Sequence, residues 1–254
     1  MQRSSVEERA VFRAGLQWRY DVHAGSVSRL LSQRPGLRAS GDPDEAIVTD
    51  LVAVRVYLTE LAAELDPALR AHPRPADPAV ACITSGLRRL ASYRGPAFRG
   101  GNLRPDQLAA YRPGSLLTER AFMRCTANRT AALPGNAEFL IWSATGRRAA
   151  GLDVPDEADV VVFAGNLQFK LLAVAAPTPG KPMRVFMREL PAARWNETAA
   201  HLTPDDQMML ARLRDALTDR DAVLPPQRRP FGDPADPGFP IGLDAANHPF
   251  PLTP

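Results

Sequence analysis

The spacing of hydrophobic residues changes along this chain near Tyr93. Before that point, apolar residues recur every three or four positions, which is the spacing of an amphipathic helix. The pattern is clearest in Asp44–Arg70, where Arg55 is the one polar residue on the apolar face. That face comprises Val48, Leu51, Val52, Arg55, Leu58, Leu61, Ala62, Leu65 and Leu69. We expect a helix there, with Pro67 as a point where it can divide in two.

Further helices follow from signals at their ends. Asp77 suits an N-cap because its carboxylate can accept a backbone N–H, and Pro78 suits the first helical position. Thr203 and Asp206 stand in the spacing of a capping box. The other expected helices are Ser5–Tyr20, His23–Leu31, Asp77–Leu90, Pro105–Tyr111 and Thr203–Thr218.

After Tyr93, short apolar runs separated by glycine, proline and asparagine replace the helical spacing. Such runs are typical of strands in an antiparallel sheet. The expected strand segments are Ala97–Phe98, Leu116–Leu117, Ala121–Cys125, Phe139–Trp142, Val160–Phe163, Leu167–Val174 and Arg184–Met187. Helices, then strands, then one helix predict an α+β fold with segregated elements. No Walker or dinucleotide-binding glycine motif occurs, which argues against a doubly wound fold.

The chain has 254 residues, of which 45% are hydrophobic, enough for one large domain with appendages. We expect a helical N-terminal extension over residues 1–40 and a main domain over residues 41–220. Residues 221–254 are rich in proline and show little periodicity, so we expect a disordered tail there.

Composition also bears on compartment and partners. No apolar run reaches the roughly 18 residues of a membrane span, and Glu7 and Glu8 interrupt the first residues where a signal peptide would be apolar. We expect a protein without a membrane partner, either cytoplasmic or exported by a specialised secretion route. Cys82, Cys125 and the four scattered histidines form no metal-ligand spacing, so we expect buried thiols and no metal.

Positive charge is concentrated in the middle of the chain. The net charge is only +3, but Ile83–Arg148 contains 11 arginines against Asp106, Glu119 and Glu138, a local balance of +8. Such a field suits a phosphate-bearing ligand or a nucleic acid, and it is equally typical of a solvated basic face. Basic strands interleaved with aromatic residues are absent from the sequence, so we expect no nucleic-acid partner.

The segment Gly95–Gly101 lies within this basic region and reads Gly-Pro-Ala-Phe-Arg-Gly-Gly. On a strand, neighbouring residues point to opposite faces, so Phe98 and Arg99 should separate an aromatic ring from a guanidinium. Gly100 and Gly101 would let the backbone turn or let a ligand approach it closely. The segment is a candidate site for contact with an anion.

Several motifs then follow in a set order. Ala53–Tyr57 reads Ala-Val-Arg-Val-Tyr, and Leu69-Arg70 follows it. Phe98-Arg99-Gly100 ends the first expected strand, and Tyr111–Gly114, reading Tyr-Arg-Pro-Gly, leads to Phe122. The later motifs are Gly135-Asn136, Phe139–Trp142, Thr145-Gly146-Arg147, Val161–Gly165 and Phe169–Leu172.

In this order, residues 50–190 resemble the arginine-type mono-ADP-ribosyltransferases, the Arg-Ser-Glu class that includes bacterial toxins. The resemblance implies a helical N-terminal lead-in followed by a split antiparallel β core of ADP-ribosyltransferase type. It implies an enzyme that transfers ADP-ribose from NAD, as substrate, to a protein side chain. It also implies a protein acceptor, and toxin-like relatives of this kind suggest an immunity or carrier protein as a further partner.

The resemblance also assigns roles to residues. Arg99 would orient the phosphates or ribose of NAD, and the Gly100 backbone would bind the nicotinamide amide. Phe122, Arg124 and Thr126 would complete the NAD-binding set. A carboxylate, Glu157 or Asp159, would stabilise the positive charge that develops on the ribose, and the other acid would polarise the acceptor.

Two positions depart from the family pattern. Arg124-Cys125-Thr126 occupies the place of the family's Ser-Thr-Ser element. Nine residues before Phe169, where the family's catalytic glutamate is expected, stands Val160. Asp159 is one residue out of register, and a one-residue slip turns a side chain to the opposite face unless a bulge restores it.

These departures leave alternatives open. One is a catalytically degenerate module with the same fold that acts in NAD binding or protein interaction. Another is a nucleic-acid-binding protein. At single positions, Arg99 would pair with a carboxylate, Arg94 would be the motif arginine instead, and the acids around Glu157 would lie in a solvated loop.

Overall fold

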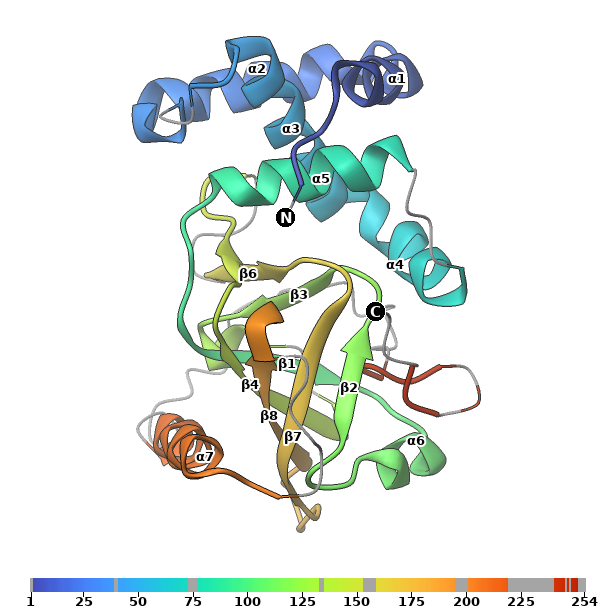
Figure 1. Cartoon of the computed structure of the whole chain (residues 1–254), viewed down its shortest axis with the longest axis vertical. Coiled ribbons are helices and arrows are strands. Elements are labelled where there is room, and N and C mark those ends of the chain that lie inside the picture. Colours follow the sequence, from blue (N-terminus) through green and yellow to red (C-terminus); the bar gives the residue numbers. More distant parts are fainter. Residues whose placement is uncertain are drawn as a thin grey trace. The chain divides into compact units, whose positions relative to one another are not determined.

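A computed structural model describes residues 2–38, 41–72, 77–132, 135–152, 159–194, 201–218, 240–244, 246 and 248–250. The chain divides into two compact units. The first unit comprises residues 1–92 and 147–156, and the second comprises residues 93–146 and 157–254. Helices dominate the first unit and a β-sheet dominates the second (Figure 1).

The helices of the first unit begin where their capping residues predict. Ser5 accepts the Glu8 N–H at 3.1 Å, and the Glu8 carboxylate accepts the Ser5 N–H at 2.7 Å. Asp77 accepts the Ala79 N–H at 2.9 Å, which confirms it as an N-cap. The elements are α1 (Val6–Leu16), α2 (Arg19–Gln33), η1 (Pro35–Arg38), α3 (Asp44–Val56), η2 (Tyr57–Leu61), α4 (Ala62–Ala71), α5 (Pro78–Arg89) and β5 (Arg147–Arg148).

Helix α3 forms the centre of the first unit. Its residues Leu51, Val52 and Val54 are fully buried. A Cβ atom on Gly86 of α5 would lie 2.2 Å from the Asp50 carbonyl oxygen, so glycine is required for this close packing of α3 and α5.

The long helix predicted over Asp44–Arg70 is interrupted at η2 rather than at Pro67. At η2 the Ala62 N–H donates to the Tyr57 carbonyl five residues earlier, which is the hydrogen bond of a π-turn. The Thr59 hydroxyl donates to the Arg55 carbonyl at 3.0 Å, a bond that favours distortion of a helix. Pro67 lies inside α4, which continues through it.

The second unit contains every strand that the sequence predicted. They are β1 (Gly95–Gly101), β2 (Leu116–Glu119), β3 (Met123–Thr126), β4 (Ala137–Ser143), β6 (Val160–Phe163), β7 (Leu167–Ala175) and β8 (Met183–Leu190). The helices between and after them are α6 (Pro105–Ala110), η3 (Arg129–Ala131), η5 (Ala192–Arg194) and α7 (Pro204–Thr218). Thr203 and Asp206 form the capping box of α7, with bonds of 2.8 and 3.2 Å.

Within this unit the strands lie in the order β2-β7-β8-β4-β1-β3-β6. Neighbouring strands run antiparallel except β4 and β8, which are parallel. The predicted α+β class is confirmed. The parallel pair was not predicted, because apolar spacing identifies strands without identifying their neighbours.

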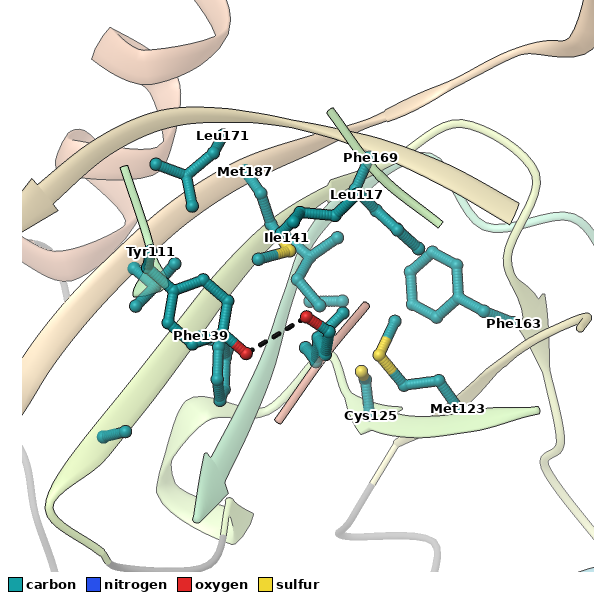
Figure 2. Packing of buried hydrophobic residues seen from close by; sticks show 14 of the residues in the cluster. Tyr111, Leu117, Met123, Cys125, Phe139, Ile141, Phe163, Phe169, Leu171 and Met187 are labelled. Carbon is teal, nitrogen blue, oxygen red and sulfur yellow. Dashed lines mark hydrogen bonds between the residues drawn. The ribbon is translucent and has the colours of Figure 1, made fainter. Parts of the chain in front are cut away.

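The sheet curves so that its two ends meet. Phe163 on β6 and Phe169 on β7 stand near opposite ends of the strand order, yet their ring centroids are 5.8 Å apart (Figure 2). The buried cluster between them, called the inner core here, fills the concave face of the sheet. Its larger members are Tyr111, Leu117, Met123, Cys125, Phe139, Ile141, Phe163, Phe169, Leu171 and Met187.

The opposite face of the sheet is covered by α7. Leu213 and Leu217 of α7 pack on Phe98 and Leu140 in a second cluster, called the α7 core here. Phe98 and Leu140 are paired across β1 and β4 and are fully buried. Successive residues of β1 and β4 therefore point alternately toward the inner core and toward the α7 core.

Part of the predicted disordered tail is packed against the sheet. Ile241 and Leu243 belong to the inner core. The Tyr111 hydroxyl donates to the Ile241 carbonyl at 3.1 Å (Figure 2), and the Gly242 N–H donates to the buried Glu119 carboxylate at 3.0 Å. The proline content of the segment hid these anchors, and residues 219–239 lie outside the described part of the chain.

Candidate functional site

Strand β1 presents its aromatic and its guanidinium on opposite faces, as its sequence predicted. Arg99 is paired with Phe139 of the inner core, whereas Phe98 lies in the α7 core. Paired residues on neighbouring strands share a face of the sheet. Arg99 therefore extends from the concave face.

The Arg99 guanidinium is half-buried on a central strand. Among the residues that the structure describes, none forms a hydrogen bond or an ion pair with it. The alternative in which Arg99 pairs with a structural carboxylate therefore finds no support in the described chain. Since a guanidinium stays charged and an uncompensated charge is costly to bury, this position favours an anion from outside the protein.

Cys125 lies near Arg99 and does not balance its charge. Burial raises the pKa of the Cys125 thiol to about 12, and the nearby Arg99 charge offsets only part of that rise. Burial likewise raises the pKa of Cys82 to about 12. Both cysteines are buried and free, as predicted, and both are neutral at physiological pH.

Gly100 and Gly101 end β1 beneath a second stretch of backbone. A Cβ atom on Gly135 would lie 2.1 Å from the Gly101 carbonyl oxygen, so the two backbone segments are in direct contact. The Asn136 side chain binds the Leu103 backbone through two hydrogen bonds of 2.8 and 2.7 Å. The Gly135-Asn136 motif thus fixes the segment that follows Gly100.

The structure does not bring Arg124 and Thr126 to the face of Arg99. Thr126 is paired with Phe98, on the α7 side of the sheet, while Met123 and Cys125 enter the inner core. The Thr126 hydroxyl accepts the Asn128 N–H and donates to the Asn128 carbonyl, both at 2.9 Å. It is therefore occupied by the turn after β3.

Phe122 and Phe169 lie in the protein interior, and Trp142 is half-buried. Phe122 is 1% exposed, directly before β3. Phe169 belongs to the inner core, and the Arg212 guanidinium lies 5.4 Å from the ring centroid of Trp142. These residues stabilise the sheet and its contact with α7.

Asp159 precedes β6, two strands from Arg99. Its carbonyl accepts the Ala127 N–H at 2.9 Å, and its φ of 43° lies in the left-handed region that few residues other than glycine adopt. Strict alternation therefore does not give the direction of its side chain. Strand β3 separates β1 from β6, so the two backbones are two strand spacings, about 10 Å, apart.

Val160 and Glu157 are the other two positions considered for the catalytic carboxylate. Val160 is 1% exposed and is paired with Thr126 inside the sheet, so the position counted from Phe169 holds a buried hydrocarbon side chain. Glu157 lies outside the described residues.

A cluster that sequence reasoning missed lies beside Gly100. Glu138 is the β4 partner of Gly100, and Arg184 on β8 is the next residue in the row. Glu138 accepts from Arg129 at 2.6 and 3.2 Å and from Arg184 at 3.1 Å. Glu138 is two residues from Leu140, so this cluster lies on the α7 side of the sheet, away from Arg99. The arginine-rich segment Ile83–Arg148 contains Arg129 but not Arg184, so no signal in the sequence indicated that the two would meet.

In the described part of the chain, no group of three or more histidine, cysteine, aspartate or glutamate residues is arranged to hold a metal ion. None of its helices is long and apolar enough to cross a membrane.

No family model matches the chain. In sequence it is 34% identical over 139 residues to the NAD(+)–arginine ADP-ribosyltransferase candidate Mav of Mycobacterium avium (strain 104), a match that covers 52% of this chain. It is 28% identical over 153 residues, 58% of this chain, to the NAD(+)–protein-arginine ADP-ribosyltransferase Tre1 of Pseudomonas putida (strain GB-1). The matches span only 17% and 30% of the lengths of those two proteins.

In structure the chain is similar to the ADP-ribosyltransferase HopU1 of Pseudomonas syringae pv. tomato DC3000. The TM-score is 0.63 at 17% identity, over 74% of this chain and 99% of HopU1. At this identity the likeness shows the fold, which is that of an ADP-ribosyltransferase, with N-terminal helices and a mixed, mostly antiparallel sheet. The chain is therefore similar in sequence, over about half of its length, to two arginine ADP-ribosyltransferases, and it shares the fold of HopU1.

Proposed function

We propose that this chain is an NAD-dependent mono-ADP-ribosyltransferase whose acceptor is an arginine side chain of a protein. The sequence similarity to Mav and Tre1 and the fold shared with HopU1 support this proposal. The observation that carries it is the half-buried Arg99 guanidinium on a central strand, where the family motif has its arginine and no described residue pairs with it.

The residues around Arg99 fit NAD, which brings two phosphates and a carboxamide. A guanidinium can donate two parallel hydrogen bonds to a phosphate, which suits Arg99 to orienting the dinucleotide. The Gly100 backbone has no side chain to shield it from the nicotinamide amide.

Breaking the bond between ribose C1 and nicotinamide leaves positive charge on the ribose. A carboxylate fixed beside the ribose lowers the barrier, because it is already oriented where that charge develops. Glu157 and Asp159 are the two candidates. In the proposed division of roles, one stabilises the ribose cation and the other polarises the attacking arginine of the acceptor.

The test is transfer of labelled ADP-ribose from NAD to agmatine, a small arginine analogue, with nicotinamide release measured in parallel. We expect Glu157→Gln and Asp159→Asn to lower transfer by unequal factors, the larger being about 10²–10³. Asp156→Asn is the control, since it removes an acid from the same segment. Equal transfer by all three variants would exclude these acids from the site.

A second candidate is a module that binds NAD without turning it over. The position of Arg124 and Thr126 on the face away from Arg99, and the buried Val160, favour it. Calorimetry with NAD, run beside the transfer assay, separates the two. Turnover would rule the second candidate out, binding without turnover would rule the first out, and absence of both would contradict each of them.

A further inference from the structure

Strand β1 is supported differently on its two sides. Toward β4 it is paired along its whole length. Toward β3 it forms one pair, Phe98 with Thr126, although both strands continue beyond that pair. Within the described sheet, the part of β1 that carries Arg99 and Gly100 is therefore held by ladder pairs on the β4 side alone. A strand end supported on one side frays more easily than one between two neighbours.

The backbone of Gly100 points away from β4. The Ala127 N–H donates to the Asp159 carbonyl at 2.9 Å, toward β6, so the adjacent Thr126 points its N–H and C=O toward β1. Thr126 is opposite Phe98, which therefore points its backbone groups toward β3, and Gly100, two residues later, points the same way. The Gly100 N–H and C=O thus lie on the side where the ladder with β3 has stopped.

Asn136 holds the chain directly after this strand end. Its Oδ1 accepts the Leu103 N–H at 2.8 Å, and its Nδ2 donates to the Leu103 carbonyl at 2.7 Å. Gly101 is paired with Ala137, and Leu103 is the next residue whose backbone points toward β4. The Asn136 amide therefore takes the place of one further ladder residue, because a side-chain amide offers a donor and an acceptor as a peptide group does.

Gly135 lets the two segments come close enough for these bonds. A Cβ atom there would lie 2.1 Å from the Gly101 carbonyl oxygen and 2.5 Å from its carbonyl carbon. Such contacts are relieved only by moving the backbone, so glycine is required at this position. The Met183 N–H of β8 donates to the Asn136 carbonyl at 2.9 Å. Asn136 thus connects Leu103 to the centre of the sheet.

We propose that Asn136 is a positioning residue for NAD, which acts by holding the Gly100 peptide groups where the nicotinamide carboxamide binds. This inference rests on the proposed function, in which the Gly100 backbone contacts that carboxamide. A carboxamide has one carbonyl acceptor and an NH2 donor, so it matches the N–H and C=O of one residue. Holding these groups in place before NAD arrives lowers the entropy lost on binding.

Asn136 is a suitable residue for testing this role. It is exposed, so its replacement leaves no cavity, and the variant should remain folded. Its two hydrogen bonds hold the segment that follows Gly100 without any contact to Arg99. The role of Asn136 can therefore be separated from that of the guanidinium.

The test measures, by calorimetry with the full chain, the Kd of NAD and of 3-acetylpyridine adenine dinucleotide, in which a methyl group replaces the carboxamide NH2. The wild-type chain should bind NAD about tenfold more tightly, because a site that accepts a hydrogen bond discriminates against a ligand without the donor. Asn136→Ala should weaken NAD binding about tenfold and analogue binding about twofold, so most of the discrimination is lost.

Two further variants and a second measurement accompany this test. Gly135→Ala should act as Asn136→Ala does, because it forces the same segments apart. Asn102→Ala is the matched control: Asn102 is also exposed, and it accepts the Asn136 N–H at 3.3 Å without contacting Leu103. Both Kd values should stay within about twofold in this control. Hydrogen exchange at residues 101–103, measured without NAD, should be faster in Asn136→Ala than in Asn102→Ala.

Equal weakening of NAD and of the analogue in Asn136→Ala would show a merely structural role and overturn the proposal. Unchanged hydrogen exchange at residues 101–103, or an equal effect of Asn102→Ala, would overturn it too. These three outcomes leave the proposed function in place. Binding of neither dinucleotide by the wild-type chain would instead contradict the proposed function, and the positioning role with it.

Discussion

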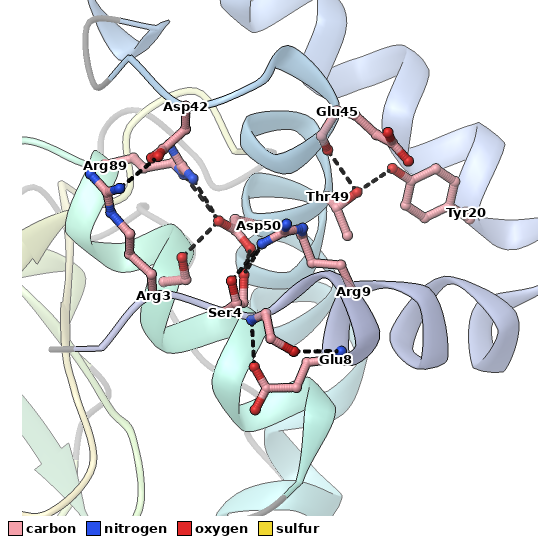
Figure 3. Close-up of polar contacts among 12 residues, drawn as sticks. Arg3, Ser4, Glu8, Arg9, Tyr20, Asp42, Glu45, Thr49, Asp50 and Arg89 are labelled. Atoms are coloured by element: carbon pink, nitrogen blue, oxygen red, sulfur yellow. Dashed lines mark hydrogen bonds and ion pairs between the residues drawn. The ribbon is translucent and has the colours of Figure 1, made fainter.

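Arg89 in the first unit and Arg99 in the second differ in what surrounds their guanidiniums. In the first unit, the Arg89 guanidinium donates to Asp50 at 2.7 and 3.2 Å and to Asp42 at 3.0 Å, and its side chain is 5% exposed (Figure 3). In the second unit, Arg99 is half-buried and has no hydrogen-bonding or ion-pair partner among the described residues.

The difference separates the structural charge of Arg89 from that of Arg99, to which we assign a functional role. Asp50 also accepts from the hydroxyls of Ser4 at 2.6 Å and Ser85 at 2.7 Å, so the charges around it are satisfied by the protein itself (Figure 3). Such a network joins the N-terminal segment to α3 and α5. Arg99 has nothing comparable, which is the expected state of a guanidinium whose anionic partner is a substrate.

The largest expected effect is loss of the network around Asp50. Asp50→Ala removes the acceptor that Arg89, Ser4 and Ser85 share, and breaking this buried network should lower the free energy of unfolding by about 3–5 kcal/mol. Urea denaturation measures it. The control, Asp44→Ala, removes the acid of an exposed pair with Arg38 and should cost less than about 1 kcal/mol.

A comparable buried group in the second unit is Asp206, which pairs with Lys170 at 2.7 Å and also with Arg188. Burial alone would raise the pKa of Asp206, but hydrogen bonds from Lys170, the Thr203 backbone and Arg188 outweigh burial and lower it. Asp206→Asn removes the charged carboxylate that the buried Lys170 and Arg188 share, so it should lower the free energy of unfolding by about 3 kcal/mol at neutral pH.

The same carboxylate predicts a dependence on pH. Because the folded pKa of Asp206 is below its unfolded value, its contribution is fully present above about pH 4 and is lost as the pH falls through the folded pKa. The acid limb of unfolding free energy against pH should therefore be shallower in Asp206→Asn. An unchanged slope would show that Asp206 does not bind its proton differently in the two states.

A smaller effect is expected at His23, whose pKa is lowered in the folded state by burial and by Arg55 and Arg19. Between that lowered value and about 6.5, the unfolded chain binds more protons, so stability should fall as the pH drops through this window. His23→Asn should flatten the dependence there, as measured by thermal unfolding at pH 5 and pH 8. A wild-type curve that rises toward pH 5 would contradict the assignment.

The smallest effect on stability is expected at Arg99. Arg99→Met removes a charge that no described residue compensates, so the free energy of unfolding should change by about 0–1 kcal/mol, if anything upward. The matched change in the first unit, Arg89→Met, removes the guanidinium that pairs with the fully buried Asp50 and should cost about 3–5 kcal/mol. An equal loss of unfolding free energy in the two variants would show that Arg99 is compensated within the protein as Arg89 is.

The sequence predicted the elements better than their arrangement. The spacing of apolar residues and the capping residues located α3, α5, α7 and the strands, because a residue's position within an element follows from local geometry. Strand neighbours depend on residues far apart in the chain, so the parallel β4–β8 pair was not predicted. The π-turn at η2 depends on side-chain bonds such as that of Thr59, which periodicity does not reveal.

Only part of the candidate site was predicted, again because the sequence pattern reveals local geometry but not contacts between distant segments. Alternation correctly placed Phe98 and Arg99 on opposite faces. It could not show that Thr126 is paired with Phe98 and so faces away from Arg99, nor that Asp159 adopts a left-handed backbone. The packing of Ile241 in the inner core was hidden by the surrounding prolines.

The central claim is that the Arg99 guanidinium binds NAD. The most direct test is the rate of labelled ADP-ribose transfer to agmatine by the variants Arg99→Lys and Arg94→Lys. Both changes keep the positive charge, but lysine cannot form the two parallel hydrogen bonds of a guanidinium. We predict that Arg99→Lys lowers kcat/KM at least a hundredfold with an unchanged Tm, and that Arg94→Lys, an exposed arginine, leaves both unchanged. Full activity in Arg99→Lys, or loss in Arg94→Lys alone, would contradict the account.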